Sequence, residues 1–218
     1  MNKLYAYRGW ILGALAIILL AMPASPFPEL TPETICSEYV FFSIILPTLV
    51  FASSVILRIQ ARRSIGEHTR GVSHDANRLV TDGMYSRIRH PLYVSNTGVA
   101  YSYILFHLGL SLRALPFVVV LVSFEILLAK MEDRYLESRF GDGWRKWAAV
   151  TPAFIPRLTR GSVSAEPLNS EKDVSYMRRS FFAAARADFS TWFWLAVAIV
   201  FVVLRKTILN FNLLELWG

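Results

Sequence analysis

Long apolar runs separated by short polar or charged segments dominate the chain. A helix needs roughly 20 consecutive apolar residues to cross the hydrocarbon core of a bilayer, and most of the runs approach that length. We expect apolar helices over residues 5–22, 39–59, 92–112, 114–129 and 189–204. The pattern therefore predicts an all-α fold, an integral membrane helix bundle of about five spans.

Two of these runs leave an alternative open. The first follows Lys3 and Arg8, as the apolar core of a secretory signal peptide does. No clean small-x-small cleavage site follows it in residues 23–26, so we expect a retained span. The last run ends at Arg205 and Lys206, and it either spans the membrane or lies partly in the interface.

The charged segments between the runs predict how the chain is oriented. Residues 23–38 contain glutamates but no lysine or arginine, whereas residues 58–89 contain seven arginines. An excess of lysine and arginine is typical of cytoplasmic loops. We therefore expect a multi-pass protein whose segment 58–89 faces the cytoplasm.

The third and fourth runs are joined by a very short connection at residues 111–113. Helices joined in this way pack as antiparallel neighbours. The end of the fourth run should then lie beside the start of the third. This arrangement predicts that Glu132 comes close to His90 at the cytoplasmic membrane surface.

The pattern divides the chain into three parts. Residues 1–160 form the expected membrane core, including an amphipathic cytoplasmic segment at residues 131–156. Residues 161–176 form a serine-rich linker, and residues 177–218 form a basic amphipathic helix followed by the fifth apolar helix.

Composition supports a membrane protein and excludes several function classes. The chain has 218 residues, is 54% hydrophobic, and carries a net charge of +7. Its basic residues flank the apolar runs instead of lining one soluble face, so we expect a membrane and no nucleic acid as partner. Cys36 is the single cysteine, and His68 and His74 lack the spacing of a helical metal pair. We expect no metal site.

The stretch Arg89-His90-Pro91-Leu92-Tyr93 is the first candidate site. Proline suits the first turn of a helix, so the third apolar helix should begin here. A helix N-terminus beside Arg89 favours a carboxylate or a phosphate. The alternative is that Arg89 and His90 anchor the helix to lipid phosphates.

Two stretches together resemble the integral-membrane methyltransferases, the superfamily of isoprenylcysteine carboxyl methyltransferases and phospholipid N-methyltransferases. The first runs from Gly83 to Tyr93, and the second runs from Glu132-Asp133 through Phe140, Gly141, Trp144 and Trp147 to Pro156. The resemblance covers about residues 79–158. It implies S-adenosylmethionine as methyl donor, bound at the cytoplasmic end of the bundle.

The resemblance also implies roles for individual residues. His90 and Tyr93 correspond to a cofactor-contacting histidine and tyrosine, and Glu132 to the first residue of a paired-glutamate motif whose second member is Asp133 here. Trp144 and Trp147 stand where the family has tyrosine. Carboxyl-methylating members carry an arginine where this chain has Leu128, which favours an amine-bearing lipid or another small lipophilic acceptor.

The chemistry of the donor fits the same residues. Its carboxylate needs an anion binder, its amine and ribose need acceptors, and its adenine needs an aromatic slot. The candidates, in that order, are Arg89 and His90; Glu132 or Asp133; and Tyr93, Phe140 or Trp144. If the acceptor must lose a proton, His90 or Glu132 could serve as general base.

Glu125 is a further catalytic candidate because ionisable residues within an apolar span are costly and often functional. It precedes Glu132 by two helical turns and so shares its face. Two interpretations stay open: a role in the acceptor pocket or in proton handling, and a structural hydrogen bond to a neighbouring helix or to Tyr103.

The function expected from these observations is methyl transfer from S-adenosylmethionine to a lipophilic acceptor, which could be a lipid amine, a prenylcysteine-like carboxylate or a thiol. Two alternatives remain. One is an NADPH-dependent membrane reductase of related architecture, and the other is a non-catalytic membrane protein for binding or assembly.

Overall fold

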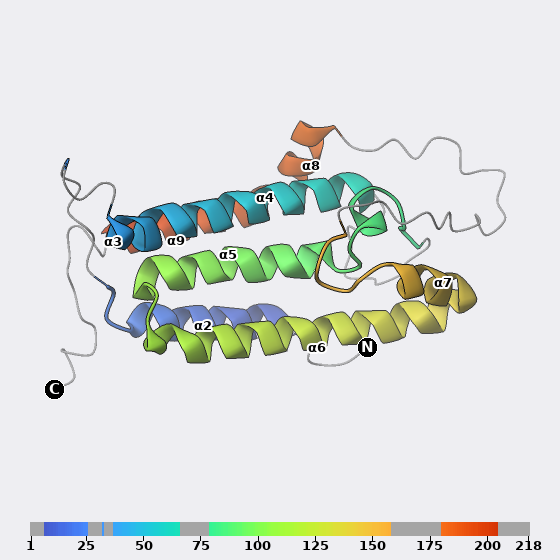
Figure 1. The fold of residues 1–218 in the computed structure, drawn as a ribbon, viewed down its shortest axis with the longest axis horizontal. Helices are drawn as coiled ribbons and strands as arrows, with labels where there is room; N and C mark the ends of the chain where they lie inside the picture. Colours follow the sequence, from blue (N-terminus) through green and yellow to red (C-terminus); the bar gives the residue numbers. More distant parts are fainter. Residues whose placement is uncertain (1–6, 26–31, 33–36, 66–78, 158–179, 205–218) are drawn as a thin grey trace. The chain divides into compact units, whose positions relative to one another are not determined.

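The computed structural model describes residues 7–25, 32, 37–65, 79–157 and 180–204. All regular secondary structure in these residues is helical (Figure 1), which confirms the predicted all-α class for this part of the chain. The elements are α2 (Arg8–Ala21), α3 (Glu38–Val40), η1 (Phe41–Ile45), α4 (Leu46–Ile65), η2 (Gly83–Ser86), α5 (Pro91–Leu108), η3 (Leu112–Ala114), α6 (Leu115–Phe140), α7 (Asp142–Val150), α8 (Phe181–Ala187) and α9 (Phe189–Leu204). The expected linker at 161–176, Cys36, His68 and His74 lie outside the described residues.

Two helical stretches among the described residues are long and apolar enough to cross a membrane. They are Glu38–Ile65, with 28 residues, and Leu112–Phe140, with 29 residues. Both coincide with expected spans. Arg8–Ala21 and Thr191–Leu204 are shorter apolar helices. Membrane association is therefore plausible from length and composition, and the number of five spans stays a prediction.

Helices α5 and α6 end at other residues than the apolar runs predict. Helix α5 stops at Leu108 because Gly109 adopts a φ of +66°, a conformation that favours glycine. Helix α6 continues past residue 129 and carries Glu132 and Asp133 before it ends at Phe140. Gly141, with a φ of +52°, then redirects the chain into α7. The segment expected to be one amphipathic element over 131–156 is thus divided between two helices and an irregular end.

The described residues fall into two compact units, whose boundaries lie within α4, α5 and α6 and after the first residue of α9. The first unit contains α2, the start of α4, most of α5, the apolar half of α6, and α9. Its core consists of six buried residues from α2 and from the hairpin that η3 closes between α5 and α6. They are Leu19, Ile104, Leu108, Ala114, Phe117 and Leu121. This packing agrees with the predicted antiparallel hairpin.

Polar contacts hold the ends of these helices together within the first unit. The Ser25 hydroxyl donates to the Leu108 carbonyl at 2.6 Å, and the Ser25 amide donates to the His107 carbonyl at 2.8 Å. They satisfy carbonyl groups that the end of α5 leaves without helical partners. The Tyr103 hydroxyl donates to the Leu195 carbonyl of α9 at 2.6 Å, so α9 is fixed to α5 by a specific bond.

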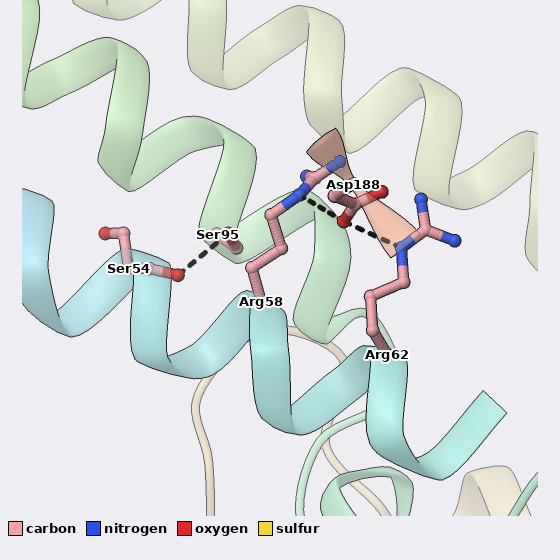
Figure 2. Close-up of polar contacts among 5 residues, drawn as sticks. All are labelled: Ser54, Arg58, Arg62, Ser95 and Asp188. Atoms are coloured by element: carbon pink, nitrogen blue, oxygen red, sulfur yellow. Dashed lines mark hydrogen bonds and ion pairs between the residues drawn. The ribbon is translucent and has the colours of Figure 1, made fainter. Parts of the chain in front are cut away.

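The second unit spans Ser54–Ser95 and Ile126–Phe189. It contains the end of α4, η2, the first turn of α5, the polar half of α6, α7 and α8. The Ser95 hydroxyl of α5 donates to the Ser54 carbonyl of α4 at 2.9 Å (Figure 2). All but one of the candidate site residues, the exception being Glu125, lie in this unit.

An ion cluster fixes the segment after α8 to α4 in the second unit. One carboxylate oxygen of Asp188 accepts hydrogen bonds from Nε of Arg58 at 2.9 Å and Nε of Arg62 at 3.0 Å (Figure 2). The Asp188 side chain is 7% exposed, so its charge needs these cations. No motif in the sequence pointed to a role for Asp188.

Candidate functional site

A short backbone pairing holds the chain just before α5. The amides of Arg89 and His90 donate to the carbonyls of Pro152 and Ala153 at 2.9 and 3.1 Å. The amide of Arg157 donates to the carbonyl of Arg87 at 3.0 Å. The amides of Arg89 and His90 are therefore used within the fold.

His90 lies between two carboxylates of α6. Its Nδ1 is 4.0 Å from Oε2 of Glu132, and its Nε2 is 3.1 Å from Oδ1 of Asp133. The His90 side chain is 3% exposed, whereas the Glu132 side chain is 42% exposed. The structure thus brings together the two stretches that were predicted to meet at the end of the hairpin, and it leaves the Glu132 carboxylate accessible.

Aromatic rings enclose the same imidazole. The ring centroids of Tyr93 and Phe154 lie 5.6 and 5.7 Å from that of His90. Tyr93 was predicted at the site from the sequence, whereas Phe154 was not. The flanking Pro152 and Pro156 were the available signal, because prolines favour an extended segment that can run beside residues 87–90.

Asp133 joins Arg89 to the histidine. Nη1 of Arg89 donates to Oδ2 of Asp133 at 3.0 Å, while the other oxygen of Asp133 faces His90. The guanidinium also lies over the Trp144 ring, 5.6 Å from its centroid. Arg89 is therefore held by a carboxylate and an aromatic face, two contacts that fix a guanidinium plane.

The two tryptophans of α7 differ in what their indole N–H groups contact. Trp147 is 3% exposed and donates to the Tyr85 carbonyl at 3.0 Å, which fixes α7 to η2. Nε1 of Trp144 is buried and has no hydrogen-bond partner within the described part of the chain, and Nε of Arg89 is in the same condition. The guanidinium and the indole that face each other thus each carry one buried donor without a partner among the described residues.

This difference gives a testable pair of substitutions. Trp147→Phe should lower the free energy of unfolding by about 1–2 kcal/mol, because the part-buried hydrogen bond from the indole to the Tyr85 carbonyl is lost. Trp144→Phe should leave it within about 0.5 kcal/mol, since its indole N–H donates to no described group. Thermal unfolding of the detergent-purified variants measures both. Equal destabilisation by the two changes would contradict a structural role for the Trp147 hydrogen bond.

The remaining candidates lie elsewhere or contribute less. Glu125 belongs to the first unit and is buried, so its expected role stays a prediction. Phe140 is the last residue of α6 and forms no ring contact with a described aromatic side chain. Leu128 is 2% exposed and packs as an apolar residue. Within the described ranges, no group of three or more His, Cys, Asp or Glu side chains could hold a metal ion.

Comparison with known proteins adds a family context to this geometry. Residues 42–143 match the sequence model of the phospholipid methyltransferase family. The cobalt-zinc-cadmium resistance protein CzcN of Cupriavidus metallidurans is 40% identical over 88 residues, which is 38% of this chain and 38% of that protein. The protein-S-isoprenylcysteine O-methyltransferase of Schizosaccharomyces pombe is 30% identical over 107 residues, 46% of this chain and 42% of that protein.

The chain matches about two fifths of the length of these curated relatives. No solved structure matches it significantly. The match over residues 42–143 includes His90, Glu132 and Asp133, whereas α8 and Asp188 lie outside it.

Proposed function

We propose that this chain, whose residues 42–143 match the phospholipid methyltransferase family and which resembles the integral-membrane methyltransferases, transfers a methyl group from S-adenosylmethionine to a lipophilic acceptor. The observation that carries the proposal is the placement of His90 between Glu132 and Asp133. It supports an enzyme site where a helix start, two acids and aromatic rings converge. We propose that this site faces the cytoplasm.

The residues present fit the chemical groups of S-adenosylmethionine. The buried donors of Arg89 and Trp144 without hydrogen-bond partners suit a carboxylate. The half-exposed Glu132 suits an amine or a ribose hydroxyl. Tyr93, with Phe140 or Trp144, offers aromatic surface for adenine. When bound, S-adenosylmethionine would supply a methyl group that its sulfonium activates.

The residues of the chain would act mainly by positioning. Asp133 fixes Arg89 and faces His90, so three side chains from α6 and from the start of α5 keep one geometry. Correct orientation can account for much of the acceleration of a direct displacement. His90 or Glu132 would accept a proton from an acceptor that must lose one, and the neighbouring carboxylate Asp133 would balance the charge on the imidazole.

Leu128 favours some classes of methyl acceptor over others. It is buried where carboxyl-methylating members of the superfamily carry arginine, so the chain offers no cation at that position to a substrate carboxylate. An amine-bearing lipid or another small lipophilic acceptor therefore fits better than a prenylcysteine-like carboxylate. A thiol remains the third acceptor class to assay.

Ligand-induced stabilisation tests the proposed function directly. A ligand that binds the folded state raises its stability, so S-adenosylmethionine and S-adenosylhomocysteine should each raise the melting temperature of the detergent-purified protein. NADPH should leave it unchanged. A shift with NADPH alone would favour a membrane reductase, and no shift with any of the three would favour a non-catalytic protein.

A matched pair of glutamates tests the placement of the donor. Glu132→Gln should weaken S-adenosylhomocysteine binding about tenfold by removing one charged acceptor. Glu137→Gln is the control, because Glu137 lies on the same helix, is 39% exposed, and bonds Arg145 instead. Isothermal titration calorimetry measures the affinity of both variants for S-adenosylhomocysteine. Equal affinities in the two variants would show that Glu132 does not contact the donor.

A further inference from the structure

The ion cluster at the end of α4, defined as Arg58, Arg62 and Asp188, joins two guanidinium groups to one carboxylate. The side chains are only 12%, 25% and 7% exposed, respectively. Both arginines use Nε to bind the same carboxylate oxygen. Asp188 therefore orients two guanidinium groups through a single carboxylate oxygen.

Arg62 has donors that the cluster does not use. Its one hydrogen bond within the described part of the chain is the Nε bond to Asp188 at 3.0 Å. In Figure 2, no dashed line joins its two terminal nitrogens to any of the residues drawn. The Nε bond limits the rotation of the guanidinium, so its terminal edge is a pre-oriented set of donors. Such an edge binds phosphate oxygens well.

The position of the cluster along α4 favours a lipid phosphate as the bound group. Arg58 and Arg62 lie in the last turns of Glu38–Ile65, a stretch apolar and long enough to cross a membrane. In the proposed orientation, this end of α4 reaches the cytoplasmic surface. Lipid phosphates lie at that depth, and basic residues at a membrane surface attract anionic lipids.

We propose that Arg62, oriented by Asp188 and flanked by Arg58, binds the phosphodiester group of a phospholipid at the end of α4. The site shares no residue with the cluster around His90, and it depends on α4 crossing the membrane and not on methyl transfer. Arg58 and Arg62 lie inside the family match at 42–143, whereas Asp188 lies outside it. The orienting carboxylate is thus supplied by a part of the chain that the family match does not cover.

Native mass spectrometry of the full-length protein in detergent tests this site. Phosphatidylglycerol should bind the wild-type protein, whereas diacylglycerol, which has the same chains and no phosphate, should not compete. Arg62→Gln should weaken the tightest phosphatidylglycerol binding about tenfold. Arg63→Gln removes the same charge from the same helix, but Arg63 bonds Gln60 at 3.2 Å, so its effect should stay within about twofold.

Several results would overturn the proposal. If Arg62→Gln and Arg63→Gln weaken phosphatidylglycerol binding equally, the binding reflects general attraction between charges and no specific site. Displacement of the lipid by millimolar inorganic phosphate would indicate a site for free anions. Competition by diacylglycerol would indicate a site for acyl chains. If Arg62→Gln does not fold, Arg62→Lys keeps the charge and removes the planar edge, and wild-type affinity in that variant would refute the role of the guanidinium. None of these results alters the stabilisation expected from S-adenosylmethionine.

Discussion

Replacing Asp188 by alanine is expected to lower the free energy of unfolding by about 3 kcal/mol, because two largely buried arginines would lose a shared counter-ion. For a protein of this size, that loss corresponds to a fall of roughly 8 °C in melting temperature. Asp188→Asn keeps the shape and removes the charge, so most of the loss should remain. Differential scanning fluorimetry of the detergent-purified protein measures both variants.

A second aspartate–arginine pair provides the control for this experiment. Asp142 bonds Arg145 at 3.1 Å, but its side chain is 84% exposed. Exposed ion pairs of this kind contribute about 0–1 kcal/mol, so Asp142→Ala should change the melting temperature little. If Asp188→Ala is as mild as Asp142→Ala, the cluster at α4 contributes no more than a surface pair.

Asp133→Asn is expected to reduce methyl transfer about 100-fold, since displacement of reacting groups by about 1 Å can have an effect of that size. Asp133 bonds Arg89 at 3.0 Å and faces Nε2 of His90 at 3.1 Å. The asparagine amide carries no charge to balance that of the Arg89 guanidinium. Its NH2 group would also point at Arg89 or at His90, where the carboxylate presents an oxygen to each. Transfer of labelled methyl groups from S-adenosylmethionine into lipid extracts measures the activity.

The effect of Asp133→Asn can be separated from a loss of folding. The melting temperature of the variant without ligand reports the fold, and S-adenosylhomocysteine binding reports the donor site. Asp142→Asn changes the same residue type on the neighbouring helix α7 and should retain full activity. Activity within about twofold of wild type in Asp133→Asn would contradict a positioning role for this carboxylate.

Part of this arrangement could be predicted from local patterns. The apolar runs predict helices because burial of apolar surface and internal backbone hydrogen bonding both require them in lipid. The short connection at residues 111–113 predicts an antiparallel hairpin, and the structure has η3 there. The approach of Glu132 to His90 follows from that hairpin without further information.

Helix ends were harder to predict. Residues such as Lys130, Glu132 and Arg134 are good helix formers, so the change from apolar to charged residues does not stop α6. The helix ends where Gly141 adopts a positive φ, and α5 ends similarly before Gly109. Hydropathy locates the edge of an apolar run, while backbone conformation determines the end of the helix.

By itself, the sequence determined that the described part of the chain is helical and that a basic segment, His90 and an acidic pair gather at one end of a hairpin. The tertiary structure decided which charges meet. Neighbouring residues on a helix point in directions about 100° apart, so packing directs Asp133 to Arg89 and leaves Glu132 half exposed. Asp188 lies 126 residues from Arg62 in sequence, and no local pattern encodes that bond.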